Sequence, residues 1–246
     1  MGRSRAPVNS PPVVPSSGLA LVEVVCILGT FPALSGLTLN VGPGEIVAVE
    51  GSNGAGKTTL LRACAGLVPI SGGSATVCGI DVRSDPASVR RTVGYLGHRS
   101  LLYEDLTVED NVRFAVESSR IAGSSIEHVR NALDAVGIGR RVAKLALHSC
   151  SAGQRRRTAL AAVVARQPKV WLLDEPHAGL DPDARDSLDV LLRGAAAAGA
   201  TVLVVSHDPD RASSFATRRV VVAGGYVTNS QLVGAGPTST EVTRGS

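Results

Sequence analysis

The chain has 246 residues, of which 44% are hydrophobic, and this suits one large domain or a core with an inserted subdomain. Only 3% of the residues are aromatic, so valine, leucine and alanine must fill the interior. The formal net charge is +4 with scattered arginines, and no apolar run approaches the roughly 18 residues of a membrane-spanning helix. We therefore expect neither a nucleic-acid-binding surface nor a membrane span.

The two ends of the chain differ in composition from its middle. Residues 1–18 are rich in proline and serine and lack the apolar stretch of a signal peptide, so we expect a disordered N-terminal tail. Residues 229–246 are interpreted in the same way, as a disordered C-terminal tail. The expected folded domain therefore covers residues 19–228.

Four cysteines are spread through this domain. They are Cys26, Cys64, Cys78 and Cys150. None has the C-x-x-C spacing of a metal or redox site, and three of the four lie in apolar surroundings. We interpret them as reduced, structural cysteines, which is their usual state in the cytosol.

Residues 19–96 are predicted to form strands around a single helix. The alternation of apolar residues in the first strands indicates partly antiparallel pairing. Within this block, Glu45–Glu50 is predicted to be a short buried strand and Thr59–Ala65 a helix.

The loop between this strand and this helix has the spacing of a phosphate-binding loop. Its residues match the pattern G-x-x-x-x-G-K-[ST], extended by one threonine: Gly51, Ser52, Asn53, Gly54, Ala55, Gly56, Lys57, Thr58 and Thr59. Glycines let the backbone wrap round a polyphosphate, and the helix start adds its positive end. Lys57 can then bind the β- and γ-phosphates and Thr58 can bind Mg²⁺. A glycine-rich surface turn is the alternative, but it leaves the lysine and the two threonines unexplained.

Residues 99–166 are helix-periodic, so we expect a helical insertion there. Thr107–Asp110 has the pattern of a helix start. Ser151, Gly153 and Gln154 precede a second helical run, where a hydroxyl and a glycine make an anion site, although Ser151 also suits a plain N-cap. The run Arg155–Arg157 is interpreted as a solvated helix face rather than a nucleic-acid patch.

A short apolar strand, Val170–Leu173, leads into two carboxylates, Asp174 and Glu175. Ligands of open α/β sheets gather at the carboxyl ends of the strands. Asp174 can hold Mg²⁺ directly or through water, and Glu175 can polarise a water molecule for attack on a γ-phosphate. Without a phosphate loop in the same chain, the pair would be interpreted as the start of a solvated loop.

The rest of the chain returns to strand–helix alternation. Pro182–Gly199 is predicted to be a helix and Thr201–Val205 a buried parallel strand. His207 follows that strand and can reach a γ-phosphate as a donor, although a single loop histidine is often a bystander. Arg219–Ala223 and Tyr226–Thr228, joined by two glycines, are predicted to form a closing hairpin.

The motifs, in this order and spacing, resemble those of the ATP-binding cassette (ABC) ATPases, with Ala178–Asp181 as a further matching segment. The resemblance implies an α/β fold, namely a P-loop NTPase core of the ABC type with an antiparallel β subdomain and an inserted helical subdomain. It implies that two cassettes close head to tail around ATP and Mg²⁺, with Ser151–Gln154 of one facing the phosphate loop of the other. Asp181 would lie in their contact, and His207 would be the switch histidine. Together with Glu175 and Lys57, His207 forms the expected catalytic set.

Three positions depart from the family pattern. Ala152 stands where the usual Leu-Ser-Gly-Gly-Gln signature has glycine, which adds a methyl group where backbone approaches phosphate. His98 stands where a glutamine is usual near Mg²⁺, and we retain it as a nucleotide-site residue. Leu28 occupies the position where many relatives stack an aromatic ring on adenine, and Phe31 can substitute.

Several motifs look like those of the haem-exporting group used in cytochrome c maturation: Val49–Arg62, Tyr95–His98 and Leu173–Asp181. The leading hypothesis is an ATP-hydrolysing subunit of an ABC exporter at the cytoplasmic face of the membrane. Its expected partners are an integral-membrane permease, docked near residues 98–106, and a second copy of the cassette, with no nucleic acid. The alternatives are a drug or lipid efflux ATPase, a soluble non-transport ABC ATPase, and a regulatory subunit that binds without hydrolysis.

Overall fold

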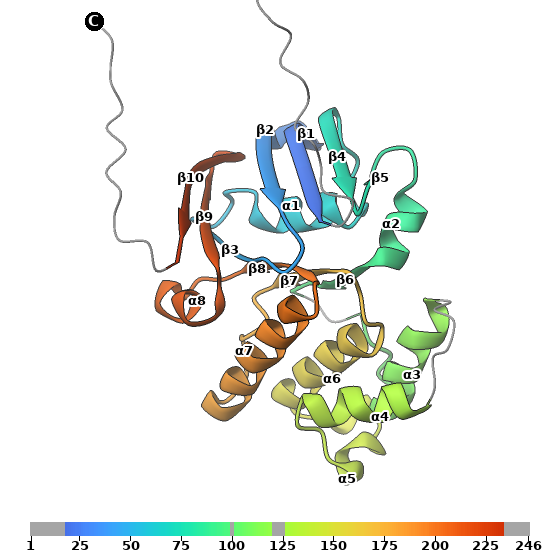
Figure 1. Ribbon diagram of the computed structural model, residues 1–246. Helices are drawn as coiled ribbons and strands as arrows, with labels where there is room; N and C mark the ends of the chain where they lie inside the picture. Colours follow the sequence, from blue (N-terminus) through green and yellow to red (C-terminus); the bar gives the residue numbers. More distant parts are fainter. Residues whose placement is uncertain (1–17, 99–100, 120–125, 234–246) are drawn as a thin grey trace, which may run out of the picture.

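The computed structural model describes residues 18–98, 101–119 and 126–233. The strands are β1 Leu19–Leu28, β2 Phe31–Val41, β3 Ile46–Glu50, β4 Gly72–Val77, β5 Ile80–Asp81, β6 Val93–Leu96, β7 Val170–Asp174, β8 Thr201–Val205, β9 Arg218–Ala223 and β10 Tyr226–Leu232. The helices are α1 Lys57–Cys64, α2 Pro86–Thr92, α3 Val108–Ser118, α4 Ile126–Ala135, α5 Arg140–Ala143, α6 Ala152–Ala165, α7 Pro182–Ala197 and α8 Pro209–Phe215, with a 3-10 helix at Leu147–Ser149. They are arranged as two sheets with α1 between them and the other large helices below (Figure 1).

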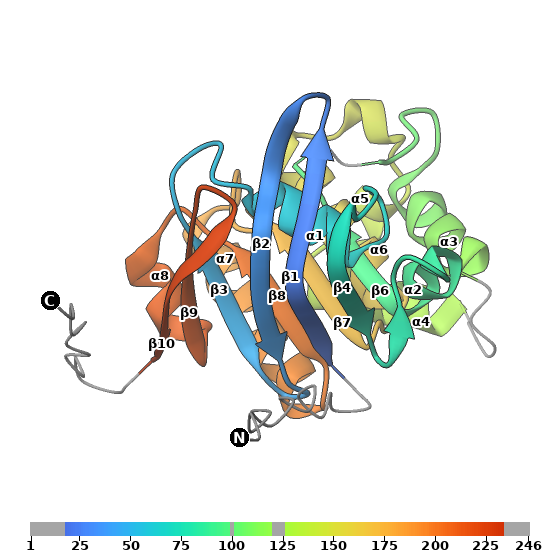
Figure 2. The ribbon, with the colours of Figure 1, turned by 90° about the horizontal axis from the view of Figure 1, so that it is seen from above.

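The larger sheet has the strand order β10-β9-β3-β8-β7-β6, and only β10 runs antiparallel to its neighbour (Figure 2). Val205 at the end of β8 pairs with Val49 of β3 and with Asp174 of β7, so these three strands end at the same edge. The phosphate loop, Glu175 and His207 each follow one of these strands. The sheet topology therefore brings the three predicted motifs together.

The smaller sheet has the order β2-β1-β4-β5 and all of its pairings are antiparallel, as the sequence predicted for its first strands. Both faces of the parallel strands are buried. Leu172 and Leu203 belong to the core that contains α1 and the smaller sheet, whereas Leu173 and Val204 belong to the core beneath, with α3, α6 and α7. Burial on both faces explains the continuous apolar runs of these strands.

The helices α3 to α6 lie in the part of the chain for which a helical insertion is expected (Figure 1). Thr107 caps α3, as predicted, because its hydroxyl accepts a hydrogen bond from the amide of Asp110 at 3.0 Å. No helix in the described ranges is long and apolar enough to cross a lipid bilayer.

Two expectations about secondary structure are wrong. The first block contains a second helix, α2, which Asp85 caps and Pro86 begins. The closing hairpin continues to Leu232 instead of Thr228, because Asn229–Leu232 pair with β9. These last residues are exposed and mostly polar, so no hydrophobic pattern marked them as a strand. Both expected tails lie outside the described residues, except Gly18 and 229–233.

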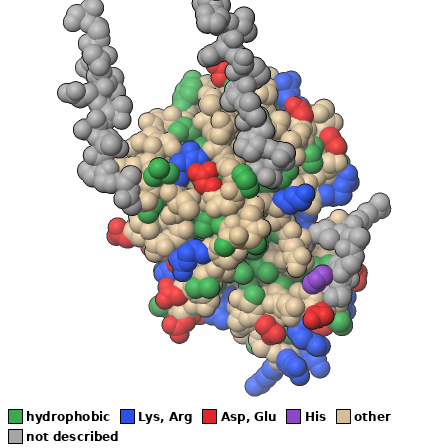
Figure 3. Space-filling view, in the orientation of Figure 1, with side chains coloured by type: hydrophobic (Ala, Val, Ile, Leu, Met, Phe, Trp, Pro, Cys, Tyr) green, Lys and Arg blue, Asp and Glu red, His purple; other side chains and the backbone are tan. Residues whose placement is uncertain are grey.

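Acidic and basic side chains are mixed on the face shown in Figure 3, and Lys and Arg gather at its lower end, where Figure 1 places α5. A hollow of about 380 Å³ there is lined by four cations and two carboxylates: Arg130, Arg140, Arg141, Lys144, Glu109 and Asp134. Because carboxylates interrupt the cations, this group is not the continuous basic stripe of a nucleic-acid-binding surface.

All four cysteines are free thiols, and they differ in exposure. Cys26, Cys64 and Cys150 are buried, whereas Cys78 is partly exposed. Burial raises the pKa of the Cys64 thiol well above its ordinary value and also raises the pKa of Cys26. Because the thiolate is the reactive form, we expect these two buried thiols to react slowly in the folded protein.

We therefore expect an aromatic disulfide reagent to modify Cys78 first when the folded protein is treated in mildly alkaline buffer. Mass spectrometry of the tryptic peptides identifies the modified thiol, and Cys78→Ser provides the control. Rapid modification of Cys64 in the native protein would contradict the buried position of α1.

Candidate nucleotide site

The phosphate loop follows β3 directly, and two of its glycines are required by the backbone. Gly51 has φ +145° and Gly56 has φ +104°. A Cβ at Gly51 would lie 2.1 Å from the carbonyl oxygen of Val222, and a Cβ at Gly56 would lie 2.4 Å from that of Ala33. Only glycine fits at either position. Gly54, at the outer turn with φ +78°, has no atom within 4 Å of a Cβ, so the loop opens toward a hollow there.

The loop is tied to its own lysine and to the end of β7. The Lys57 ammonium donates to the carbonyl oxygens of Gly51 at 2.6 Å and Ser52 at 2.9 Å, which places a positive charge over the loop. The Thr58 hydroxyl donates to Oδ2 of Asp174 at 2.8 Å. The hydroxyl and the carboxylate that are predicted to hold Mg²⁺ therefore lie side by side.

Glu175 follows Asp174 with φ +51°, an uncommon conformation for a residue with a side chain. Its amide donates to the carbonyl oxygen of Val205 at 3.1 Å, and its Oε1 lies 3.0 Å from Nε2 of His207. Burial raises the pKa of the Glu175 carboxyl, and Asp174 adds to this, whereas His207 and Lys57 act against it. A carboxylate with a raised pKa is a better proton acceptor near neutral pH.

These residues line one hollow of about 730 Å³. Its lining includes the phosphate-loop residues Asn53 to Thr59 and, from the other segments, His98, Asp174, Glu175, Ala178, Val205 and His207. Leu28 and Phe31 line its rim and are 43% and 66% exposed. The structure thus brings together the phosphate loop, both carboxylates and both predicted histidines.

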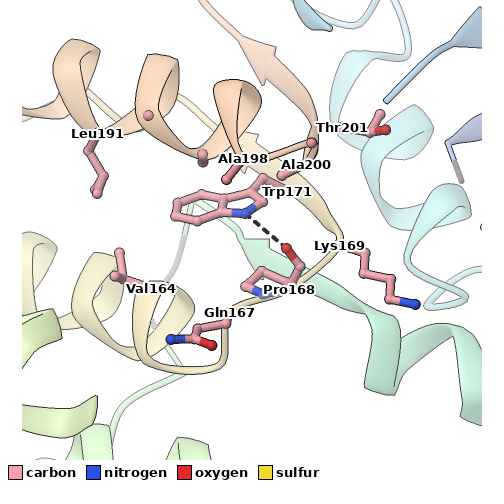
Figure 4. Close-up of a pocket in the computed structure, with 12 residues that line it drawn as sticks. Val164, Gln167, Pro168, Lys169, Trp171, Leu191, Ala198, Ala200 and Thr201 are labelled. Carbon is pink, nitrogen blue, oxygen red and sulfur yellow. Dashed lines mark hydrogen bonds between the residues drawn. The ribbon is translucent and has the colours of Figure 1, made fainter. Parts of the chain in front are cut away.

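A second hollow, of about 660 Å³, lies at the opposite edge of the sheet, where β7 and β8 begin (Figure 4). Trp171 stands in its wall and donates its indole N–H to the carbonyl oxygen of Pro168 at 3.1 Å. Its other walls include Val164 and Leu191, and it lacks the phosphate loop and the carboxylates. The residues that are predicted to bind phosphate therefore line the first hollow and not the second.

The chain matches the family described as "ABC transporter" over residues 34–178. It belongs to this family. A "Cytochrome c biogenesis ATP-binding export protein CcmA" of Nitrobacter winogradskyi is 38% identical over 185 residues, which are 75% of this chain and 88% of the relative. A "Daunorubicin/doxorubicin resistance ATP-binding protein DrrA" of Streptomyces peucetius is 35% identical over 87% of this chain and 64% of its own length.

The cassette covers a smaller share of some relatives. A "Putative ABC transporter ATP-binding protein" of Streptomyces avermitilis is 38% identical over 243 residues, 96% of the cassette, which spans only 40% of that protein. Among solved structures, the dimeric post-hydrolysis state of an ATP-binding cassette bound to ADP and Pi has a TM-score of 0.80 and 26% identity. This match covers 87% of the present cassette and 98% of that chain, and it shows the P-loop NTPase fold.

The signature residues of the cassette lie outside the nucleotide hollow, at helix starts. Ser151 and Gln154 form a capping box at α6, in which the Ser151 hydroxyl accepts from the Gln154 amide at 3.2 Å.

Asp181 caps α7 and pairs with Arg157. The Ala184 amide holds the pKa of the Asp181 carboxyl below its ordinary value, and Arg157 adds to this. Gly153 lies close to the loop before α7: a Cβ added at Gly153 would lie 3.2 Å from the carbonyl oxygen of Gly179.

Arg156 is a site residue that the sequence interpretation missed. It is only 8% exposed, so the Arg155–Arg157 run is not a solvated face. Its guanidinium donates to the carbonyl oxygens of Gly97 at 2.9 Å and of Asp174 and Glu175, both at 2.6 Å. Arg156 thus holds the backbone on which both carboxylates stand.

Replacing Arg156 with lysine is expected to lower the free energy of unfolding by about 1–3 kcal/mol, because one ammonium cannot satisfy carbonyl groups at three separate positions. Urea denaturation followed by circular dichroism measures the difference. Arg62→Lys, at an exposed position of α1, is the matched control and should remain close to the wild type. Equal stability of the two variants would contradict the role given to Arg156.

Proposed function

We propose that this cassette binds ATP with Mg²⁺, hydrolyses it and drives an ABC exporter from the cytoplasmic face of the membrane. The observation that carries the proposal is the convergence of Lys57, the Thr58–Asp174 pair and the Glu175–His207 pair on one hollow. Its volume of about 730 Å³ lies within the roughly 300–1,000 Å³ that is usual for small-molecule sites.

The residues present fit the substrate phosphates and the metal. The loop amides and the Lys57 ammonium supply the positive field for the β- and γ-phosphates. The Thr58 hydroxyl and the Asp174 carboxylate are hard oxygen donors only 2.8 Å apart, the ligand type that Mg²⁺ prefers. When bound, Mg²⁺ supplies charge that neutralises the phosphate oxygens.

Glu175 is the residue that would orient the attacking water and accept its proton. Its backbone is fixed by Arg156 and by the end of β8, so the carboxylate is held in place at the edge of the hollow. His207 lies 3.0 Å from it and is half exposed toward the hollow, where it can donate to a γ-phosphate oxygen. Leu28 and Phe31 would offer the adenine ring an apolar rim.

A second cassette completes the proposed site. Ser151, Gly153, Gln154 and Asp181 lie away from the hollow of their own chain, at the starts of α6 and α7. A helix start with a free hydroxyl hydrogen and amide donors suits the phosphates of a neighbouring subunit. We propose a homodimer, and the dimeric cassette of similar fold supports this arrangement.

For the cargo we propose haem, exported for cytochrome c biogenesis. The support is the 38% identity to the CcmA protein over 88% of that protein's length, together with the motifs Tyr95–His98 and Leu173–Asp181. The similarity to the DrrA resistance protein, at 35% identity, favours drug efflux as the second candidate. Both candidates require a membrane permease from another chain.

Changing Glu175 to glutamine is expected to lower the rate of ATP hydrolysis by about 100-fold or more, since the carboxylate that accepts the proton is lost. ATP binding should be retained because the phosphate loop is untouched. Phosphate release and equilibrium binding of a fluorescent ATP analogue measure the two quantities. Hydrolysis at the wild-type rate in this variant would contradict the assignment of Glu175.

Tagged Glu175→Gln protein, recovered from native membranes in ATP, should bring down a multi-span permease. Cytochrome c assembly proteins in the same complex would support haem export, and a permease without them would support another efflux system. Recovery of ribosomal proteins instead of a permease would contradict transport.

The proposed docking surface at residues 98–106, of which 99 and 100 lie outside the described residues, can be tested in the same experiment. Glu104 is already paired with Arg155 at 2.7 Å, so its reversal disturbs the cassette itself. Asp105 is exposed, and Asp105→Lys is therefore the cleaner variant. We expect it to reduce permease recovery several-fold while Asp183→Lys, at an exposed position of α7, does not. Equal recovery from both variants would contradict docking at this surface.

A further inference from the structure

We propose that Asp189 of α7 clamps together the loop that carries Glu175 and the loop that carries His207, which makes His177 and Arg211 positioning residues for hydrolysis. This inference rests on the proposed function, because ATP hydrolysis is the step that the clamp serves. The residues concerned lie behind the nucleotide hollow rather than in its phosphate-binding wall.

The first arm of the clamp is His177, two residues after Glu175. The turn between them is closed by the Ala178 amide, which donates to the Glu175 carbonyl oxygen at 3.1 Å. Nε2 of His177 lies 2.7 Å from Oδ1 of Asp189, and their side chains are only 12% and 6% exposed. The imidazole also packs on Phe215 with ring centroids 5.3 Å apart. His177 is therefore fixed on two sides by buried groups.

The second arm is Arg211 in α8, the helix that begins two residues after His207. Asp208 caps this helix by accepting from the Arg211 amide at 3.0 Å. The Arg211 guanidinium lies 2.7 Å from Oδ2 of Asp189 and 2.7 Å from Oδ1 of Asp186. The two oxygens of Asp189 thus contact the loop after β7 through His177 and the helix after His207 through Arg211, and Oδ2 also accepts from the Ser214 hydroxyl at 3.3 Å.

The consequence concerns the spacing of Glu175 and His207. A buried carboxylate that loses a partner strongly destabilises the folded protein. Displacement of either loop would leave the Asp189 carboxylate without one of its partners, and this cost opposes the displacement. The two loops line a common hollow of about 200 Å³ in which His177 and Arg211 form part of the wall. We infer that the 3.0 Å separation of Glu175 Oε1 and His207 Nε2 is maintained from behind by this clamp.

The test compares kcat and KM for ATP in three variants of the full chain. Small misplacements of reacting groups are costly, so His177→Leu should lower kcat by about 10-fold or more while KM stays within about 2-fold. His177→Gln places an amide N–H where Nε2 stood and should recover most of the loss. Arg193→Leu is the matched control, because Arg193 joins α7 to α8 through the Ser214 carbonyl oxygen without contacting Asp189 itself, and the Ser214 hydroxyl that donates to Asp189 Oδ2 is left in place. It should behave as the wild type.

Three results would overturn the clamp. These are an unchanged kcat in His177→Leu, no recovery in His177→Gln, and an equal loss in Arg193→Leu. A further check combines His177→Leu with Arg211→Leu: because both act through one carboxylate, the double variant should lose little more than the worse single variant. Losses that multiply would show two independent effects and would also overturn it.

A measurement without nucleotide separates this proposal from the proposed function. The ring signals of His207 in NMR spectra, assigned with His207→Gln, should move in His177→Leu and in Asp189→Asn but not in Arg193→Leu. If the wild type hydrolyses no ATP, the proposed function fails and these signals still decide the clamp. If it hydrolyses ATP but the His207 signals and kcat are unaffected in the clamp variants, the clamp alone fails.

Discussion

The arrangement of the site depends on one buried cation. Arg156 extends from the first turns of α6 and donates to backbone carbonyl oxygens at the ends of β6 and β7. Burial lowers the pKa of this guanidinium, and the carboxylates of Asp174 and Glu175 oppose the shift. A buried charge is costly without hydrogen-bond partners, so any rotation or sliding of α6 that breaks these three bonds is opposed. Arg156 therefore ties the helical insertion to the edge of the sheet that carries Asp174 and Glu175.

Much of the site could be predicted because its determinants are local in sequence. The phosphate loop combines a strand, required glycines and a helix start within about twenty residues, and its positive φ angles confirm why Gly51 and Gly56 are glycines. The burial of β7 and β8 on both faces produces apolar runs that are visible without a structure. Parallel strands then place Asp174, Glu175 and His207 at a common edge, because connections in such sheets follow few topologies.

What could not be predicted depends on contacts between distant segments. Consecutive residues of a helix point about 100° apart, so the three arginines of α6 cannot share one face. Arg155 pairs with Glu104, Arg156 is buried and Arg157 pairs with Asp181. Helix geometry alone therefore argues against a common solvated face, but it does not say which arginine turns inward. The same holds for His177, whose partners Asp189 and Phe215 are 12 and 38 residues away along the chain.

The capping box at Ser151 has a consequence for the helix that bears it. A serine hydroxyl has two acceptor positions and one hydrogen, and the Gln154 amide occupies only one of the acceptor positions. The Ser151 hydrogen and the second lone pair stay available while the capping box holds the first turn of α6. A neighbouring anion can thus be met by rotation about a single Cβ–Oγ bond, with no unwinding of the helix and no loss of its terminal hydrogen bonds.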